Sequence, residues 1–180
     1  PFEKVSSDKG VALELSRVAT PYGNISTNYG TLDVPAVANT RDPYGTPLCW
    51  AAAAASIIMY RSNTVGLTAY GVYSEVLPFN PSPNQGSVAW VEKAYDIHHL
   101  SHTYRGSGRT YDETVAIISG NTPIYMSLSN GNTAQNHAVV LCGYQHAPGG
   151  YYSYQVMDPS SDTTTQRAWI TCYSGSSMRG

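Results

Sequence analysis

The sequence predicts an α+β fold in which a helical lobe faces an antiparallel β-sheet lobe. Its helix-like segments gather before residue 120, and its strand-like segments follow Pro123, separated by Gly, Asn, Pro or Asp. This order is typical of α+β folds, because α/β folds alternate the two kinds of element. With 180 residues, of which 42% are hydrophobic, the chain is long enough for one sizeable core. No internal repeat interrupts this organisation.

The first forty residues are predicted to be extended or irregular, with one or two strands. Short alternating stretches such as Val11–Leu15 favour strands, but Pro21, Gly23 and Pro35 break them. Two interpretations of residues 1–33 stay open: additional strands on the sheet lobe, or the remnant of a propeptide.

The strongest helix is predicted from Cys49 to Arg61. The segment CWAAAAASIIMYR contains neither Gly nor Pro, is rich in the best helix former, and follows Pro47 where a helix start tolerates proline. Five consecutive alanines allow neighbouring backbone to approach from every side. We therefore expect this helix to be central and buried.

The remaining elements follow the same two patterns. Further helices are expected at residues 67–77, 87–98 and 111–119, and strands at residues 124–128, 137–144, 151–157 and 166–173.

Composition excludes several classes of function. Charged residues make up 12% of the chain, against roughly 25% in an average soluble domain. The net charge is -2 and the basic residues are scattered, which argues against nucleic-acid binding. The longest apolar run, Ala51–Tyr60, is about half of the roughly 20 residues that a membrane span needs. A surface with few lysines and many Tyr, Ser and Asn residues favours an extracellular, secreted protein.

The three cysteines, Cys49, Cys142 and Cys172, cannot all pair with one another, so at least one thiol is free or pairs outside the chain. Cys49 is expected in the first turn of the alanine-rich helix, where free backbone N–H groups and the helix dipole lower the pKa of a thiol. This position suits a nucleophile better than a buried structural cysteine.

A thiolate nucleophile needs a base that a third group holds in place. His137 begins an apolar strand, and Asp158 ends the next one. A hairpin that turns about Ala147–Pro148 places the two residues directly opposite, within reach of a bond from Nδ1–H to the carboxylate. A turn at Gly149–Gly150 places His137 opposite Asp162 instead.

Strand alternation puts Cys142 on the face opposite His137. Cys142 is therefore expected to be a core residue or, as the alternative, a partner of Cys172.

Three short blocks together resemble the papain-like cysteine peptidases. They are the runs LCWAA at residues 48–52, NHAVVLCGY at residues 136–144 and MDP at residues 157–159. The chain is most similar to the compact bacterial branch with a CWAA nucleophile motif and a Cys-His-Asp triad, which includes AvrRpt2-type, staphopain-like and C39-like peptidases. The resemblance extends from about residue 39 to residue 169.

The resemblance implies a two-lobed papain-like domain over residues 1–180. Residues 34–120 would form the mainly helical lobe, and residues 121–180 the mainly β lobe. It also implies an endopeptidase with Cys49 as nucleophile, His137 as base and then acid, and Asp158 orienting His137. Such an enzyme acts on protein or peptide substrates, needs no cofactor or metal, and is expected to be a monomer.

One position departs from the family pattern. The family places a Gln about six residues before the nucleophile, and its amide completes the oxyanion hole together with the backbone N–H of the cysteine. That position is Pro43 here. Asn39 carries the same amide but requires a loop that bulges through residues 41–46, and the hydroxyl of Tyr44 is the other local candidate. Backbone groups alone, or an inactive hole, remain as further alternatives.

Two other functions use the same residues. A papain-like amidase or acyltransferase has the same triad but passes the acyl group to another acceptor. A catalytically silent module that only binds peptides is favoured solely by the missing Gln.

Two further features are weighed against simpler roles. His98, His99 and His102 include a pair at metal-ligand spacing near Asp96, but no third ligand stands at motif spacing, so exposed histidines are the better interpretation. Trp169 is expected to be a core residue or, as in papain-like enzymes, a shield over His137 and Asp158.

Overall fold

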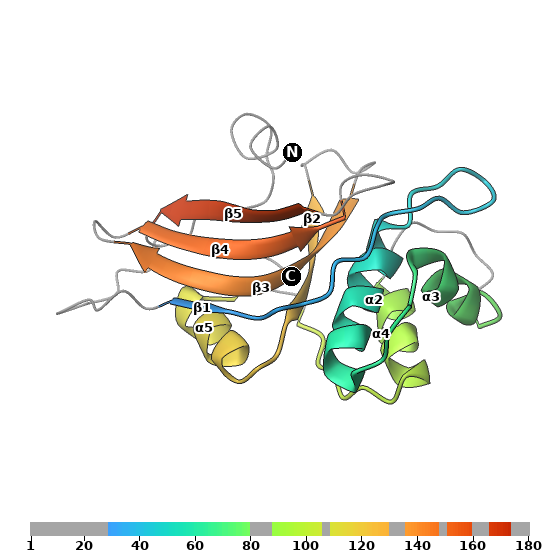
Figure 1. The fold of residues 1–180 in the computed structure, drawn as a ribbon, viewed down its shortest axis with the longest axis horizontal. Coiled ribbons are helices and arrows are strands. Elements are labelled where there is room, and N and C mark those ends of the chain that lie inside the picture. Colours follow the sequence, from blue (N-terminus) through green and yellow to red (C-terminus); the bar gives the residue numbers. More distant parts are fainter. Residues whose placement is uncertain are drawn as a thin grey trace.

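The computed structural model describes residues 29–79, 88–105, 109–129, 136–147, 151–159 and 166–173. In chain order the elements are β1 (Tyr29–Thr31), α2 (Cys49–Ser62), α3 (Ala69–Val76), α4 (Val88–Ile97), α5 (Tyr111–Ser119), β2 (Ile124–Ser129), β3 (Asn136–Ala147), β4 (Tyr151–Asp158) and β5 (Gln166–Tyr173). Figure 1 shows the sheet beside a group formed by α2, α3 and α4.

The five strands in the described residues form one antiparallel sheet organised around β3, the longest of them. β4 pairs with one edge of β3, and β5 continues the sheet beyond β4. The other edge of β3 is shared, because β2 pairs with its first half and β1 with its second half. The order β1-β3-β4-β5 therefore leaves β2 beside the end of β3 that carries His137.

Helix α2 lies at the centre of the larger core. The five alanines from Ala51 to Ala55 are all 0% exposed, and the helix packs between α3 and α4 on one side and β3 on the other. Small side chains let the β3 backbone approach, so Val140 and Cys142 pack in the same core as the helix. The expected central, buried helix is confirmed.

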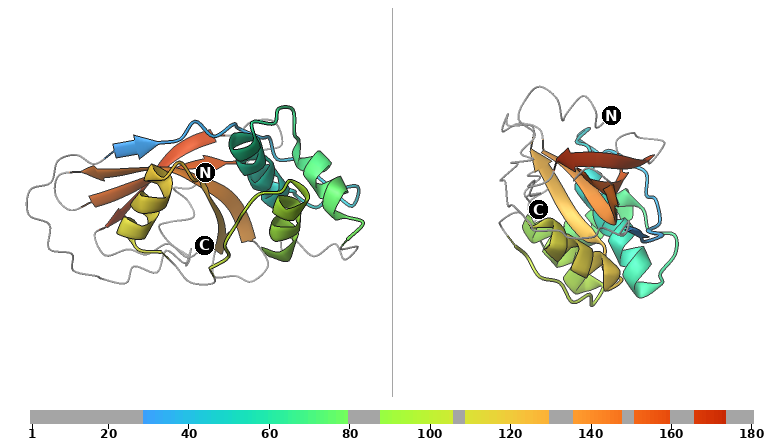
Figure 2. Two further views of the ribbon diagram at one scale, coloured as in Figure 1. Left: turned by 90° about the horizontal axis from the view of Figure 1, so that it is seen from below. Right: turned by 90° about the vertical axis from the view of Figure 1, so that its left-hand side faces the viewer.

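Helix α5 follows the other helices in sequence but packs elsewhere. It lies against β1 and β3, apart from α2, α3 and α4 (Figure 2). Tyr111 of α5 stacks on Tyr152 of β4 with ring centroids 4.1 Å apart. A second core forms here, which includes Ile118, Val139, Leu141, Tyr144, Tyr154 and Val156. The sheet thus separates two cores, and the α2 core carries the predicted nucleophile.

Local sequence explains where the shorter helices begin. The side chain of Thr110 accepts from the backbone N–H of Glu113, and the Glu113 carboxylate accepts from the backbone N–H of Thr110. This reciprocal capping box starts α5. Thr68 caps α3 by accepting from the N–H of Gly71 at 3.0 Å.

The α+β class is confirmed, and each helix and strand expected between residues 49 and 173 is present with shifts of a few residues at its ends. Of the first forty residues, the stretch Val11–Leu15 lies outside the described residues. No helix in the described part of the chain has both the length and the apolar character for crossing a membrane.

Candidate active site

Cys49 is the first residue of α2, and no side chain caps the start of this helix. The N-cap residue, Leu48, provides no side-chain hydrogen bond, and the first turn contains no acidic residue. The free N–H groups and the positive end of the helix dipole therefore act on Cys49 without competition from a capping side chain. The thiol is half-buried and free.

His137 stands near the start of β3, opposite Leu128 of β2, and its Nε2 contacts Oδ1 of Asp158. The Asp158 side chain is only 6% exposed, whereas that of His137 is 33% exposed. The carboxylate therefore holds the ring from the protein interior, and the ring keeps an edge open to solvent.

The contact between His137 and Asp158 was expected, but two of its details are corrected. Tyr144 pairs with Tyr154 near the turn, and after a bulge beside Cys142 the register moves so that Val140 pairs with Met157. Neither expected register, with His137 directly opposite Asp158 or opposite Asp162, is present. Continuing the ladder by one residue places Asp158 opposite Val139, so His137 is its diagonal neighbour.

The second correction concerns the ring nitrogen. Nε2, not Nδ1, meets the carboxylate. Nδ1 is therefore the nitrogen left for Cys49.

The surroundings of Cys49 favour a thiolate. Burial acts to raise the pKa of the thiol, but hydrogen bonds from the His137 side chain and the backbone of Ala138 and Trp50, together with the charge of His137, lower it below its ordinary value. The anion is stabilised by donors from both sides of the interface, because Trp50 belongs to α2 and Ala138 to β3.

His137 is shifted in the opposite direction. Burial acts to lower its pKa, but hydrogen bonds with Asp158 and Cys49, and the charges of both, raise it to about 9. A lowered thiol pKa beside a raised imidazole pKa is the arrangement of a thiolate–imidazolium pair at neutral pH. Such a pair can deliver a nucleophile and then a proton.

A hairpin between residues 39 and 48 brings Asn39 to the start of α2. Arg41 and Pro47 form a β-bridge, and the N–H of Leu48 donates to the carbonyl of Thr40 at 2.8 Å. Asn39 precedes Thr40 and Cys49 follows Leu48, so this hydrogen bond holds Asn39 near the start of α2. The loop bulge that Asn39 needed, through residues 41–46, is therefore present.

The hairpin is held by its own hydrogen bonds. Oδ1 of Asp42 accepts from the backbone N–H of Tyr44 at 2.9 Å and of Thr46 at 2.7 Å, and Arg41 donates to the carbonyl of Gly45. Asn39 is 7% exposed, and its Oδ1 has no hydrogen-bond partner among the described residues. A buried amide beside the nucleophile suits the oxyanion hole.

The other oxyanion candidate, Tyr44, lies in a different environment. It stands at the tip of the hairpin and is 82% exposed, the opposite of a donor held in a dry site. We correct this expectation: the same turn that brings Asn39 inward carries Tyr44 outward.

Trp169 also differs from both roles expected of it. It is 40% exposed, pairs with Gln155 across the β4–β5 ladder, and its ring lies 5.9 Å from that of Tyr29. Asp158 pairs with Gln166 at the far end of the same ladder. Trp169 is thus neither a core residue nor a shield for the His137–Asp158 contact.

Sequence reasoning missed Tyr125 of β2. Burial and the nearby charge of Cys49 raise the pKa of its phenol, so this side chain forms part of the surroundings of the thiolate. It pairs with Val140 of β3. No motif marks it; only the pairing of β2 with β3 reveals it.

The other titratable residues singled out in the sequence have structural environments. Cys142 is buried and forms no disulfide, so the expected alternative of a bond to Cys172 is absent. His98 is half-buried against Glu75 at 2.8 Å, whereas His99 and His102 are exposed. No three potential metal ligands gather within the described ranges.

Comparison with known proteins gives one match. The model of the Peptidase_C39 like family matches residues 31–176, most of the chain and all the residues of the site above. No curated protein and no solved structure matches this sequence.

Proposed function

We propose that this chain, which belongs to the Peptidase_C39 like family of papain-like cysteine peptidases, is an endopeptidase that cleaves protein or peptide substrates through Cys49. The observation that supports this most directly is the continuous set of contacts from Cys49 to His137 to Asp158. The lowered pKa of Cys49 and the raised pKa of His137 are the shifts that a nucleophile and its proton donor require.

The reaction follows from these contacts. The Cys49 thiolate attacks the substrate carbonyl, and the oxyanion that forms lies near the backbone N–H of Cys49 and the amide of Asn39. His137 then gives its proton to the leaving amine, and the C–N bond breaks to leave a thioester. Water, deprotonated by His137, then attacks the thioester; the acid product leaves, and the Cys49 thiolate and the His137 imidazolium are restored.

A direct test uses the recombinant chain with an unstructured protein substrate such as casein. We expect internal cleavage, measured by mass spectrometry of the fragments, and stoichiometric labelling of Cys49 by iodoacetamide at neutral pH. Cys142→Ala is the matched control, because it removes a thiol that is buried in the core. Cleavage that survives Cys49→Ala would exclude this residue as the nucleophile.

The same experiment separates the alternatives. An amidase or acyltransferase would transfer the acyl group to an added amine, such as glycine methyl ester, in preference to water. A silent peptide-binding module would bind casein peptides without cleaving them, and Cys49 would be labelled no faster than a free thiol.

Two further proposals concern the state of the protein. We propose a secreted location, supported by the Lys-poor and Tyr-rich composition, and tested by immunodetection in culture medium and cell fractions. We propose a monomer, tested by light scattering on a size-exclusion column; a mass of twice 19.4 kDa would contradict it.

A further inference from the structure

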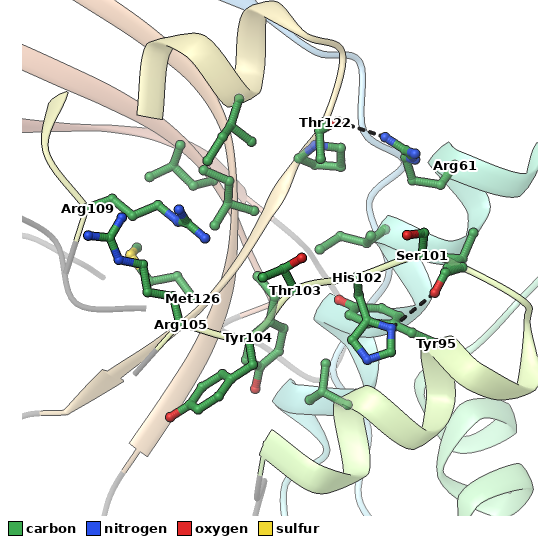
Figure 3. A pocket seen from close by; sticks show the side chains of 18 of the residues that line it. Arg61, Tyr95, Ser101, His102, Thr103, Tyr104, Arg105, Arg109, Thr122 and Met126 are labelled. Carbon is green, nitrogen blue, oxygen red and sulfur yellow. Dashed lines mark hydrogen bonds between the residues drawn. The ribbon is translucent and has the colours of Figure 1, made fainter. Parts of the chain in front are cut away.

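A cavity whose lining excludes Cys49 lies between the helices and the sheet. It has a volume of about 640 Å³ and is lined by residues from α2 and α4, the segment that follows α4, helix α5, and strand β2 (Figure 3). Ligand pockets of small molecules usually measure about 300–1,000 Å³. The cavity therefore has the size of a ligand site.

This cavity is distinct from the candidate active site. Cys49, His137 and Asp158 are absent from its lining. The α2 residues that do line it, Ile57 and Arg61, lie about 12 and 18 Å along the helix from Cys49 at 1.5 Å per residue. Tyr125 is common to both regions, because it lines the cavity and the charge of Cys49 acts on its phenol.

The walls of the cavity are largely apolar. Six of the residues that form them are Ile57, Val91, Leu100, Ile124, Met126 and Leu141. An apolar surface of this kind favours the hydrocarbon part of a ligand, because binding removes it from water.

Charge is distributed unevenly around these walls. Among the described residues, the lining contains three guanidinium groups, those of Arg61, Arg105 and Arg109, and one carboxylate, that of Glu92. Figure 3 shows Arg105 and Arg109 on the same side of the cavity, whereas Arg61 lies on the other side beside Thr122. Two of the three guanidinium groups therefore lie on one side, and the Glu113 carboxylate pairs with that of Arg105.

The three arginines differ in what already binds them. Arg61 donates to the Thr122 hydroxyl at 2.8 Å, and Arg105 pairs with Glu113 at 2.6 Å. Arg109 makes no hydrogen bond or ion pair with any residue in the described part of the chain. Its planar guanidinium, next to that of Arg105, matches the geometry of a ligand carboxylate.

A second unpartnered group stands in the wall. Tyr95 is 7% exposed and lines the cavity, and its hydroxyl is buried with no hydrogen-bond partner among the described residues. An unmet buried hydroxyl is costly, and a ligand or an ordered water in the cavity can satisfy it.

We propose that this cavity binds a small amphipathic carboxylate, with its acid group on Arg105 and Arg109 and its apolar body between β2 and α4. The lining disfavours a cationic ligand, because the guanidinium groups repel it. It also disfavours a strongly polar anion, because most of the remaining wall could not solvate it. In a ligand with one carboxylate on an apolar chain, the carboxylate can bind the arginines and the chain can contact the apolar wall.

The test is calorimetric titration of octanoate into the Cys49→Ala protein, so that the result is independent of peptidase activity. We expect one site per chain. 1-Octanol should bind at least about tenfold more weakly, because it lacks the charge that Arg109 would pair with, and octylamine should not bind. Equal affinities for the three compounds, or no octanoate binding at millimolar concentration, would overturn the proposal.

Variants locate the binding. Arg109→Gln should weaken octanoate about tenfold and leave 1-octanol unchanged, whereas the matched control Lys93→Gln, which removes a cation outside the lining, should change neither. Ala116→Trp, at an exposed α5 position of the lining, should block both compounds. Circular dichroism checks that each variant is folded, and octanoate affinity that survives both Arg109→Gln and Ala116→Trp in folded protein would place binding elsewhere.

Discussion

His137 and Asp158 meet on a diagonal of the β3–β4 ladder, through Nε2 of the ring. The bulge beside Cys142 sets this geometry, because it moves the register by one residue between the turn and the site. With Nε2 engaged by the carboxylate, the other side of the ring is available to Cys49. One imidazole thus connects a buried carboxylate to a half-buried thiol.

Replacing Asp158 should alter both rate and pH dependence. Asp158→Ala should lower kcat/KM by about 10²-fold or more, the lower end of what a positioned general base contributes. Because Asp158 helps to raise the pKa of His137 to about 9, its loss should move the alkaline limb of the kcat/KM profile to lower pH. Peptide hydrolysis measured between pH 5 and pH 10 checks both effects.

Asp158→Asn is the conservative comparison. Its amide oxygen still accepts a hydrogen bond from Nε2, so the rate should fall less than in Asp158→Ala, while the alkaline limb should still move. An unchanged pH profile in both variants would show that Asp158 does not act on His137.

The pH dependence of Cys49 alkylation reports directly on the thiolate. The pKa of Cys49 is lowered and that of His137 is raised to about 9, so the ion pair persists between the two values. The rate of iodoacetamide labelling should therefore stay high well below the free-thiol value of about 8.5. It should fall only in acid, as the thiolate gains a proton.

His137→Ala provides the control, because it removes both the hydrogen bond and the charge that lower the thiol pKa. Labelling in this variant should rise along a single limb near the free-thiol value. The same single limb in the unmodified protein would mean that the ion pair does not form. If the pair does form, the apparent pKa values of the labelling profile belong to Cys49 and His137 together.

The elements were predictable from the sequence, but the ladder register was not. Pattern and breaker residues located β3 and β4 to within a few residues, because alternation and turn residues act locally. The bulge beside Cys142 depends on packing instead: a Cβ added at Gly143 would come within 2.9 Å of Thr31 and Gln155. Turn symmetry alone could not reveal that close approach.

The candidate site shows the same division. Cys49 and His137 stand in strong local patterns, whereas the burial of Asn39 depends on the hairpin between residues 39 and 48. The exposure of Tyr44 and Trp169 could not be predicted, because it depends on which way a turn or sheet face points, and sequence spacing does not encode that direction.

Cys49→Ala should abolish cleavage and preserve the fold. The substitution removes a sulfur from the start of a helix that is already rich in alanine, so little packing is lost. Turnover should drop by at least about 10³-fold, since His137 then has no nucleophile to activate. The thermal midpoint of unfolding should stay within a few degrees of that of the unmodified protein. An inactive variant that is also unfolded would contradict the expectation that the fold is preserved.

Asp42 should influence catalysis from the far end of the hairpin. Its carboxylate accepts two backbone hydrogen bonds, from Tyr44 and Thr46, and so fixes the turn that returns the chain from Asn39 to Cys49. Asp42→Ala should lower kcat about tenfold by loosening Asn39, with little change in Cys49 labelling. Asp42→Asn keeps an acceptor oxygen and should recover most of the rate, which separates positioning of Asn39 from a charge effect.

Asn39→Ala tests the oxyanion hole itself. If the side-chain amide donates to the developing oxyanion, kcat should fall about 10²-fold, as it does when a single donor of this kind is removed. KM should change little, because the bond strengthens only in the transition state. Steady-state hydrolysis of one peptide substrate measures both constants.

Alkylation of Cys49 should survive Asn39→Ala, because it passes through no tetrahedral oxyanion; this distinguishes a damaged hole from a damaged nucleophile. Tyr44→Phe is the matched control and should be neutral, since the phenol points into solvent. If Tyr44→Phe lowered kcat and Asn39→Ala left it unchanged, the hairpin would have to fold over the site during the reaction. If both variants were neutral, backbone N–H groups alone would stabilise the oxyanion, and Asn39 would have only a structural role beside the nucleophile.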